Sequence, residues 1–237
     1  MPPGDLVKPD DTGPGAEANV ARAPAIPEAY PEWAKALAAR YFSATTSVFL
    51  LHGNVHDFVG CEPGADPEYV GLADFLATRL FGSWDVVLHY DLGRGLRPLA
   101  GSDAKRLQKM LPFTGIMGAP KRWPREPDKA FRNVGAYLDR TMLGGGTVDP
   151  EKKIKLPKSV AVILQHAQYV VPDADINSLT YGPGARLVRL LDWAQNPYIK
   201  RRNIAFCLIA DKLSEVNSRL VQNPYVASVE VPLPDSA

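Results

Sequence analysis

The stretch of sequence from Asn203 to Val221 reads NIAFCLIADKLSEVNSRLV, and it decides the fold class. It opens with an apolar run of strand length, which ends at a polar pair, Asp211 and Lys212. A second apolar run lies near the end of the chain, in the stretch VEVPLPD that begins at Val229. Short apolar runs on either side of a helical turn are typical of buried strands in a parallel sheet.

The same alternation of apolar runs and helical patterns extends back towards the start of the chain. Strands are predicted over Ser47–His52, Asp85–Tyr90, Ser159–Leu164, Ile204–Ala210 and Ala227–Val231. Helices are predicted over Pro31–Phe42, Tyr69–Phe81, Asp103–Leu111, Asp128–Leu143 and Ala185–Ala194. Because strands that alternate with helices are joined by right-handed crossovers, we predict an α/β fold. It is a three-layer sandwich around a five-stranded, mostly parallel sheet.

Length and composition are those of an ordinary globular domain. The chain has 237 residues, is 46% hydrophobic and carries a formal net charge of +1, so neither a nucleic-acid partner nor a membrane surface is indicated. Its apolar runs are too short to span a bilayer, and its start lacks the apolar segment of a signal peptide. A cytoplasmic location is therefore the expectation. Cys61 and Cys207 show no metal-binding spacing.

Two segments fall outside the regular alternation. Residues 1–31 are rich in Pro, Gly, Ala and Asp without periodicity, which predicts a flexible arm before an ordered domain at 32–237. Residues 102–157 contain two helical patterns where one crossover helix would suffice. We interpret this second segment as an insertion that stands partly off the sheet.

The closing stretches and the order of strands resemble the end of the AAA+ ATPase core, where an apolar strand carries a sensor residue and a last strand closes the sheet. This resemblance covers roughly Ser47 to Asp235. It implies a P-loop NTPase-like fold, that of the AAA+ large subdomain. The chain ends soon after the last predicted strand, so no lid domain is expected.

The phosphate-binding loop that the resemblance implies lacks most of the residues that bind phosphate. A P-loop needs glycine-rich backbone, a lysine for the phosphates and a hydroxyl for Mg²⁺. The Walker A position holds Gly53, Asn54, Val55, His56 and Asp57, and the chain contains no Gly-Lys dipeptide. A Gly-x-Gly sequence at Gly93 follows the second predicted strand, where it is interpreted as a tight turn.

The remaining catalytic positions of the family are also changed. The resemblance places Gln165, His166 and Gln168 where the Walker B acids would be, and neutral amides do not supply the charge that holds a hard divalent cation. The sensor position falls at Asp211 or Lys212.

The arginine-finger position falls in the stretch Asn223–Tyr225, where Pro and Tyr cannot stabilise a γ-phosphate. Arg219 and Tyr225 are instead candidates for a contact between subunits. We therefore interpret the chain as a degenerate, non-catalytic AAA+ domain of a tandem-domain ATPase, without catalytic residues, metal or cofactor.

The function that this interpretation implies is assembly or scaffolding of an ATP-driven remodelling complex. The expected partners are further copies of the chain or an active AAA+ domain in a ring, with a protein client possible and ATP and Mg²⁺ confined to a parent protein. One alternative is an AAA+ segment that still binds or hydrolyses nucleotide.

A second alternative is a metal-dependent hydrolase that uses His52, His56 and His89, with Asp91 as the alternative to His89. These residue types lie at the ends of predicted strands, where open α/β sheets place their sites.

Overall fold

The computed structural model describes residues 27–28, 30–43, 46–60, 69–143, 156–175 and 178–233. The predicted arm, residues 1–31, therefore lies almost wholly outside the described residues. Six strands form the central sheet: β1 (Val48–Gly53), β4 (Val86–Asp91), β5 (Gly95–Pro98), β6 (Ser159–Leu164), β7 (Asn203–Ile209) and β8 (Val226–Val231). Their order is β5-β4-β6-β7-β1-β8. A separate two-stranded hairpin consists of β2 (Phe58–Gly60) and β3 (Tyr69–Gly71).

The α/β fold with a mostly parallel sheet is confirmed, but five strands was one too few. Every neighbouring pair in the central sheet is parallel except β4 and β5. The chain reverses after β4 because the Asp91 carboxylate accepts a hydrogen bond from the amide of Arg94. Gly95 then has a φ of 79°, and a side chain there would meet the backbone of Arg125. The predicted tight turn at Gly93 is thus present, and a sixth strand follows it.

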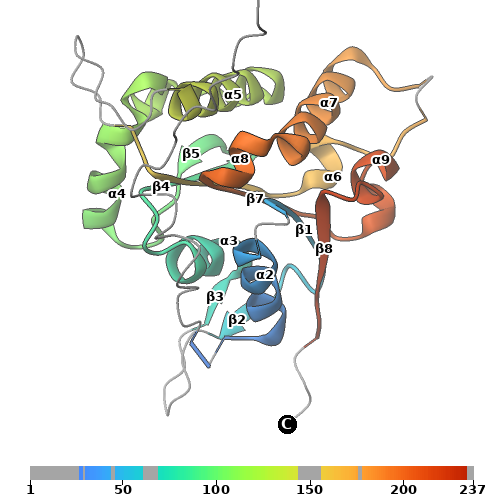
Figure 1. Ribbon diagram of the computed structural model, residues 1–237, viewed down its shortest axis with the longest axis horizontal. Coiled ribbons are helices and arrows are strands. Elements are labelled where there is room, and N and C mark those ends of the chain that lie inside the picture. The colour runs from blue at the N-terminus through green and yellow to red at the C-terminus, as the bar shows by residue number, and fades with distance from the viewer. Residues whose placement is uncertain are drawn as a thin grey trace, which may run out of the picture.

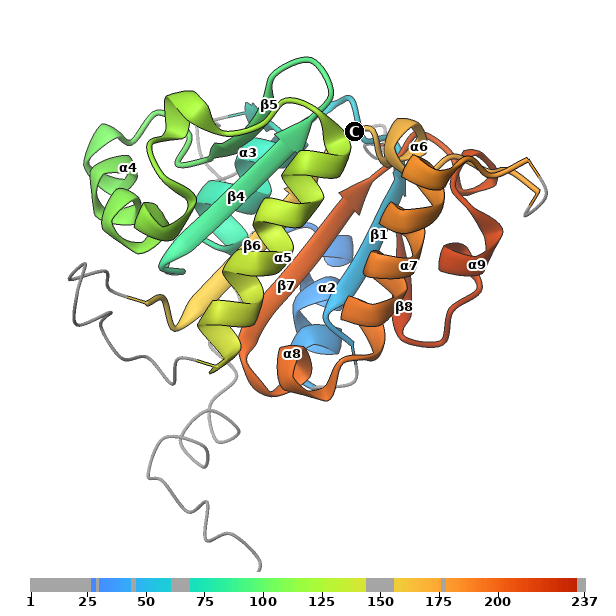
Figure 2. The ribbon, with the colours of Figure 1, turned by 90° about the horizontal axis from the view of Figure 1, so that it is seen from above.

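Helices cover both faces of this sheet (Figures 1 and 2). Their bounds are α2 (Glu32–Phe42), α3 (Leu72–Phe75), α4 (Ala104–Met110), α5 (Pro127–Leu143), α6 (Ala167–Val170), α7 (Tyr181–Gln195), α8 (Pro197–Arg201) and α9 (Ser218–Val221). The predicted helix over Tyr69–Phe81 was wrong in its first turn, because Tyr69–Gly71 pair with β2. The helical part is α3 continued by a π-helical segment, Leu76–Leu80.

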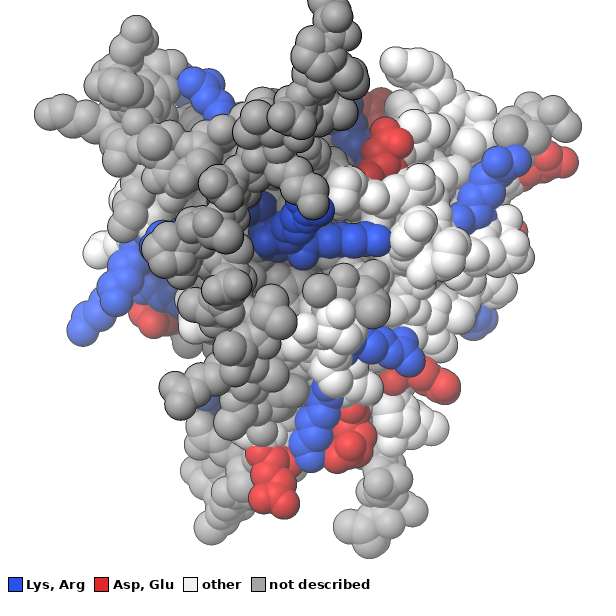
Figure 3. Space-filling model, viewed as in Figure 1, with Lys and Arg blue, Asp and Glu red and all other residues white. Residues whose placement is uncertain are grey.

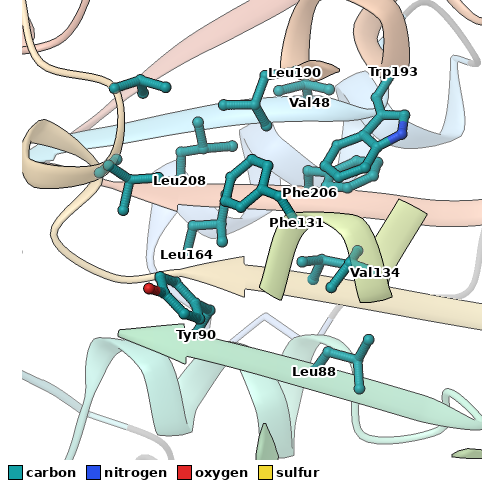
Figure 4. Close-up of a cluster of buried hydrophobic side chains, with 14 of the residues drawn as sticks. Val48, Leu88, Tyr90, Phe131, Val134, Leu164, Leu190, Trp193, Phe206 and Leu208 are labelled. Carbon is teal, nitrogen blue, oxygen red and sulfur yellow. The ribbon is translucent and has the colours of Figure 1, made fainter. Parts of the chain in front are cut away.

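Alternation along the strands divides the core into two clusters. In β1, Val48 and Leu50 face the cluster beneath α5 and α7, whereas Phe49 and Leu51 face the cluster that includes α2 and α3. Figure 4 shows the first cluster, where the rings of Phe131, Trp193 and Phe206 gather between helix and sheet; Trp193 stacks on Phe206 with ring centroids 4.9 Å apart. Apolar residues on both faces of a strand are what a sheet covered on both sides requires.

The segment at 102–157 divides into two parts. Helix α5 belongs to the regular cover of the sheet, since Phe131, Val134 and Leu138 are buried in the first cluster. An ion pair between Asp128 and the nearly buried Arg186 links α5 to α7. In Figure 2, α4 lies at the β5 edge of the sheet. Whether that outer part is an insertion stays a prediction.

The face of the molecule seen in Figure 1 carries side chains of both charges. Figure 3 shows Lys and Arg side chains near Asp and Glu side chains on the face seen in Figure 1, in keeping with the net charge of +1. Among the described residues, no helix has the length and apolar character needed to cross a membrane.

Candidate functional site

A polar cavity of about 310 Å³ lies where the carboxyl ends of the parallel strands meet. Five chain segments contribute to its lining: the loop after β1, the start of α3, the β4–β5 hairpin, the segment after β6, and the end of β7. In open α/β sheets, ligands bind at this edge. The loop after β1 and the segment after β6, where the resemblance places the Walker A and Walker B positions, both contribute residues to this cavity.

The loop after β1 does not present its amides to this cavity as a phosphate-binding loop would. The N–H of Gly53 donates to the carbonyl of Asp211 (3.2 Å), that of Asn54 to Val231 (2.8 Å), and that of Val55 to Gly53 (2.8 Å). Gly53 has a φ of 94°, and a Cβ there would lie 2.8 Å from the Val231 carbonyl oxygen. The glycine is thus used for a close approach to β8, and these three amides are already bonded within the protein.

No helix begins directly after this loop. The chain enters β2 at Phe58, and the helix that precedes β4 begins only at Leu72. A P-loop gains anion affinity from the amides and dipole of the helix that follows it at once. Here the first turn of α3 brings the carboxylate of Asp74 to the cavity wall, which disfavours a second negative charge.

The segment after β6 contributes two of its three predicted residues to the cavity. Gln165 and His166 line it, whereas Gln168 is buried and lies outside the lining, with neither side-chain amide atom hydrogen-bonded in the described part of the chain. His166 adopts the left-handed conformation, with φ 56° and ψ 51°. Of the described residues other than glycine, it alone has a positive φ.

A closed polar network occupies the β4–β5 side of the cavity. The ring Nδ1 of His89 accepts a hydrogen bond from Nε of Arg97 (3.2 Å), so its Nε2 carries the proton and donates to Gln165 Oε1 (3.0 Å). Asp91 Oδ2 lies 3.7 Å from both His89 and Arg97. Burial, followed by the positive charge of Arg97, lowers the pKa of His89 to about 4. His89 is therefore a neutral structural residue near pH 7.

The β1–β7 side holds a second and more open group. His56 Nε2 lies 2.8 Å from Asp211 Oδ1, and the ring centroids of His56 and His166 are 5.7 Å apart. One ligand atom from each of His56, His166 and Asp211 lies within 4.8 Å of the others. Of the two residues at the predicted sensor position, Asp211 belongs to this group and Lys212 does not. Lys212 is exposed, and its Nζ lies 3.9 Å from Oε1 of Glu215.

The metal site of the hydrolase alternative was wrong in its residues. Among the described residues, the group that could hold an ion is His56 with His166 and Asp211, and it contains neither His52 nor His89. His52 lies in β1 and His89 lies in β4. These two strands are not neighbours, because β6 and β7 lie between them in the sheet. His89 also has both ring nitrogens in hydrogen bonds.

The two candidate interface residues lie away from the cavity of their own chain. Tyr225 immediately precedes β8, whose first residue pairs with the first residue of β1, so it lies at the amino edge of the sheet. The residue is 42% exposed, and Lys200 Nζ is 3.8 Å from the centroid of its ring. The amide of Arg219 donates to the side chain of Asn217, which caps α9.

Sequence reasoning missed Arg97 and the role of Gln165 as the partner of His89. A usable signal was His89 itself, because a histidine inside the apolar strand Val86–Asp91 must find hydrogen-bond partners. Nothing in the sequence identified Arg97 as that partner, since the antiparallel strand β5 had not been predicted.

Comparisons with known proteins agree with this architecture. A family model described as "AAA+ chaperone, N-terminal Rossmann-like domain" matches residues 18–232. A comparison with curated proteins gave no match.

Among solved structures, a chain of the E. coli MS115-1 HORMA:CdnC:Trip13 complex is similar at 10% sequence identity with a TM-score of 0.40, over 85% of this chain and 56% of that one. The chain thus spans little more than half of that relative, and a likeness this distant carries no inference about activity. The family match covers most of the chain, which therefore belongs to the family of N-terminal Rossmann-like domains of AAA+ chaperones.

Proposed function

We propose that this domain is a degenerate, non-catalytic AAA+-like module that serves assembly or scaffolding in an ATP-driven remodelling complex. Membership of an AAA+ chaperone family supports the remodelling setting. The degenerate state is supported by one observation above the others: the amides of Gly53, Asn54 and Val55 bond to protein carbonyls. A loop whose amides are already bonded has to break those bonds before it can surround a phosphate.

The charges around the cavity support the same proposal. The carboxylates of Asp74 and Asp91 line it, and the lysine of a P-loop has no counterpart in the loop after β1. Arg97 faces the network of His89 and Asp91. A triphosphate entering the cavity would lose its hydration without a matching set of donors, which costs several kcal/mol for a charged group.

Calorimetric titration of the chain with ATP tests this proposal, with Mg²⁺ present in one series and EDTA in the other. We expect neither Mg²⁺-dependent binding nor release of inorganic phosphate. Micromolar binding together with phosphate release would contradict the proposal. A parallel titration of an active AAA+ domain verifies that the assay detects binding.

Nucleotide retention without hydrolysis is the competing function, and the guanidinium groups of Arg94 and Arg97 favour it because both line the cavity. This alternative predicts Mg²⁺-independent binding of ATP and ADP that weakens in Arg94→Ala. Arg94 is the informative position, since its side chain is exposed and its loss leaves the His89 network intact. Saturable binding lost in that variant would replace the scaffold proposal with nucleotide retention.

The assembly role is proposed for the face that carries Tyr225. Burial of one tyrosine side chain contributes about 1.5 to 3 kcal/mol, too little to hold isolated domains in a ring. Tethering to an active AAA+ ring supplies the remaining affinity through effective concentration. We therefore expect the isolated chain to be monomeric or weakly self-associating.

Light scattering over a concentration series measures self-association of the isolated chain, and the same measurement on a parent assembly compares Tyr225→Ala with the unmodified protein. Tyr181→Ala is the matched control, because Tyr181 is 90% exposed and starts a helix. We expect the assembly to weaken in Tyr225→Ala and not in Tyr181→Ala. Equal assembly of both variants would show that the Tyr225 face is not the interface.

A further inference from the structure

Three adjacent strands bring three metal-ligand side chains to one point. His56 follows β1, His166 follows β6 and Asp211 follows β7, and in the sheet β7 lies between β6 and β1. Because the three strands are parallel, their carboxyl ends lie at the same edge. The candidate ligand atoms lie within 4.8 Å of one another.

We propose that His56, His166 and Asp211 form a binding site for a divalent transition-metal ion of the zinc class. Two imidazoles and one carboxylate form a ligand set that suits Zn²⁺ and its first-row neighbours, whereas Mg²⁺ prefers oxygen ligands alone. The proposal goes beyond the scaffold function, since metal binding requires neither nucleotide nor a partner.

The distances between the side chains are close to those that an ion would impose. Ligands at about 2.0–2.2 Å from a tetrahedral Zn²⁺ lie roughly 3.3 Å from each other. His56 and Asp211, now 2.8 Å apart, would separate slightly, and the third ligand atom, which lies within 4.8 Å of the others, would approach by at most about 1.5 Å.

The backbone already holds the three residues in place. The amide of Gly53 donates to the Asp211 carbonyl, which ties the loop of His56 to the end of β7. The amide of Gln165 donates to the Tyr90 carbonyl (2.9 Å), which holds the segment that carries His166. The left-handed conformation of His166, uncommon for a residue with a side chain, is part of the arrangement that brings its ring near that of His56.

The site is accessible and has room for one more ligand. The side chain of His56 is 59% exposed and that of Asp211 is 40% exposed, so an ion can enter from solvent. His56 and His166 also line the 310 Å³ cavity. Three protein ligands leave a fourth position of a tetrahedral ion for water or for an anionic group from a partner.

Zinc titration of the full chain, carried without a histidine tag, tests the site. We expect one equivalent of Zn²⁺ to bind with roughly micromolar or higher affinity, because three preorganised ligands are available, and Mg²⁺ to give no signal. The visible spectrum of the Co²⁺-substituted protein reports whether the ion is four-coordinate. Binding should weaken at acidic pH, since ligand histidines must be neutral.

Three variants remove one ligand each: His56→Ala, His166→Asn and Asp211→Asn. Asparagine at position 166 tolerates the left-handed conformation, so loss of binding there is not an effect of backbone strain. Each variant should lower the affinity for Zn²⁺ about tenfold or more, whereas His52→Ala, which removes a histidine outside the group, should leave it unchanged.

A urea unfolding curve verifies that every variant is folded before its affinity is compared. Absence of stoichiometric Zn²⁺ binding by the unmodified chain would overturn the proposal. Binding that survives in both His56→Ala and His166→Asn, or that is lost in His52→Ala, would overturn it equally.

Discussion

His56 lines the cavity and His89 lies behind its β4–β5 wall, and the protein holds the two side chains in different ways. His89 is fully buried, and each of its ring nitrogens has a hydrogen-bond partner. His56 is largely exposed and contacts Asp211 across the loop after β1. The side chains on the β4–β5 side are therefore fixed by hydrogen bonds within the protein, whereas those on the β1–β7 side can rearrange around a ligand.

This contrast separates the side chains that the fold requires at this edge from those that it leaves available to a ligand. The sheet needs apolar faces, and the buried polar groups at its carboxyl edge need hydrogen-bond partners. The network of His89, Gln165 and Arg97 supplies those partners on the β4–β5 side. Nothing in that requirement calls for a nucleotide. On the β1–β7 side, His56 and Asp211 are exposed enough to hydrogen-bond with water instead.

The largest effect is expected on the closed side. His89→Ala should lower the free energy of unfolding by about 3 kcal/mol, because it leaves a cavity in the core and removes the hydrogen-bond partner of the half-buried Gln165 and Arg97 side chains. Urea denaturation at pH 7 measures this change. A loss below about 1 kcal/mol would show that the buried network contributes little.

The pH dependence of stability should identify the same histidine. The pKa of His89 is about 4 when folded and 6.5 in its ordinary state, so between these values the unfolded chain binds a proton that the folded chain does not. The stability that the protein gains from keeping His89 neutral is therefore fully present above pH 6.5 and is lost as the pH falls towards 4. Between pH 7 and pH 5 the free energy of unfolding should fall by about 2 kcal/mol for this reason.

The measurement for this second prediction is a series of urea denaturation curves from pH 7 to pH 5, recorded for the unmodified chain and for His89→Gln. Carboxylates titrate in both proteins, so the difference between the two curves isolates the histidine. We expect the stability of His89→Gln to depend less steeply on pH. Parallel curves would contradict the assignment of a neutral, buried His89.

A smaller effect is expected at His166, on the open side. His166→Gly should change the free energy of unfolding by less than about 1 kcal/mol, because glycine adopts a φ of 56° without strain but has more freedom when unfolded. His166→Val is the matched comparison, and it should be less stable than His166→Gly by about 1–2 kcal/mol. Thermal unfolding distinguishes the two variants, and equal stability would contradict a left-handed residue 166.

The smallest effect is expected at His56. An exposed contact between polar side chains contributes about 0–1 kcal/mol, so His56→Ala should alter the free energy of unfolding by no more than about 0.5 kcal/mol in the absence of metal. Chemical denaturation in the presence of EDTA measures it. If His56→Ala lowered the free energy of unfolding as much as His89→Ala does, the two sides of the cavity would not differ in their contribution to stability.

The sequence by itself determined the fold class and the order of its elements. The strand predicted over Ser159–Leu164 is β6 with the same bounds, and the others agree within a residue or so, because a buried parallel strand must be apolar on both faces. The sequence also predicted a degenerate phosphate-binding loop, because the chain contains no Gly-Lys dipeptide.

Only the tertiary structure decided which polar residues meet. The sheet order places β7 between β1 and β6, so His56 lies with His166 and Asp211 rather than with His52 and His89. The antiparallel β5 brings Arg97 opposite His89, and its presence depended on a turn rather than on an apolar pattern. Contacts across a sheet depend on strand order and register, which local sequence preferences do not specify, because the energy that selects them comes from packing between distant segments.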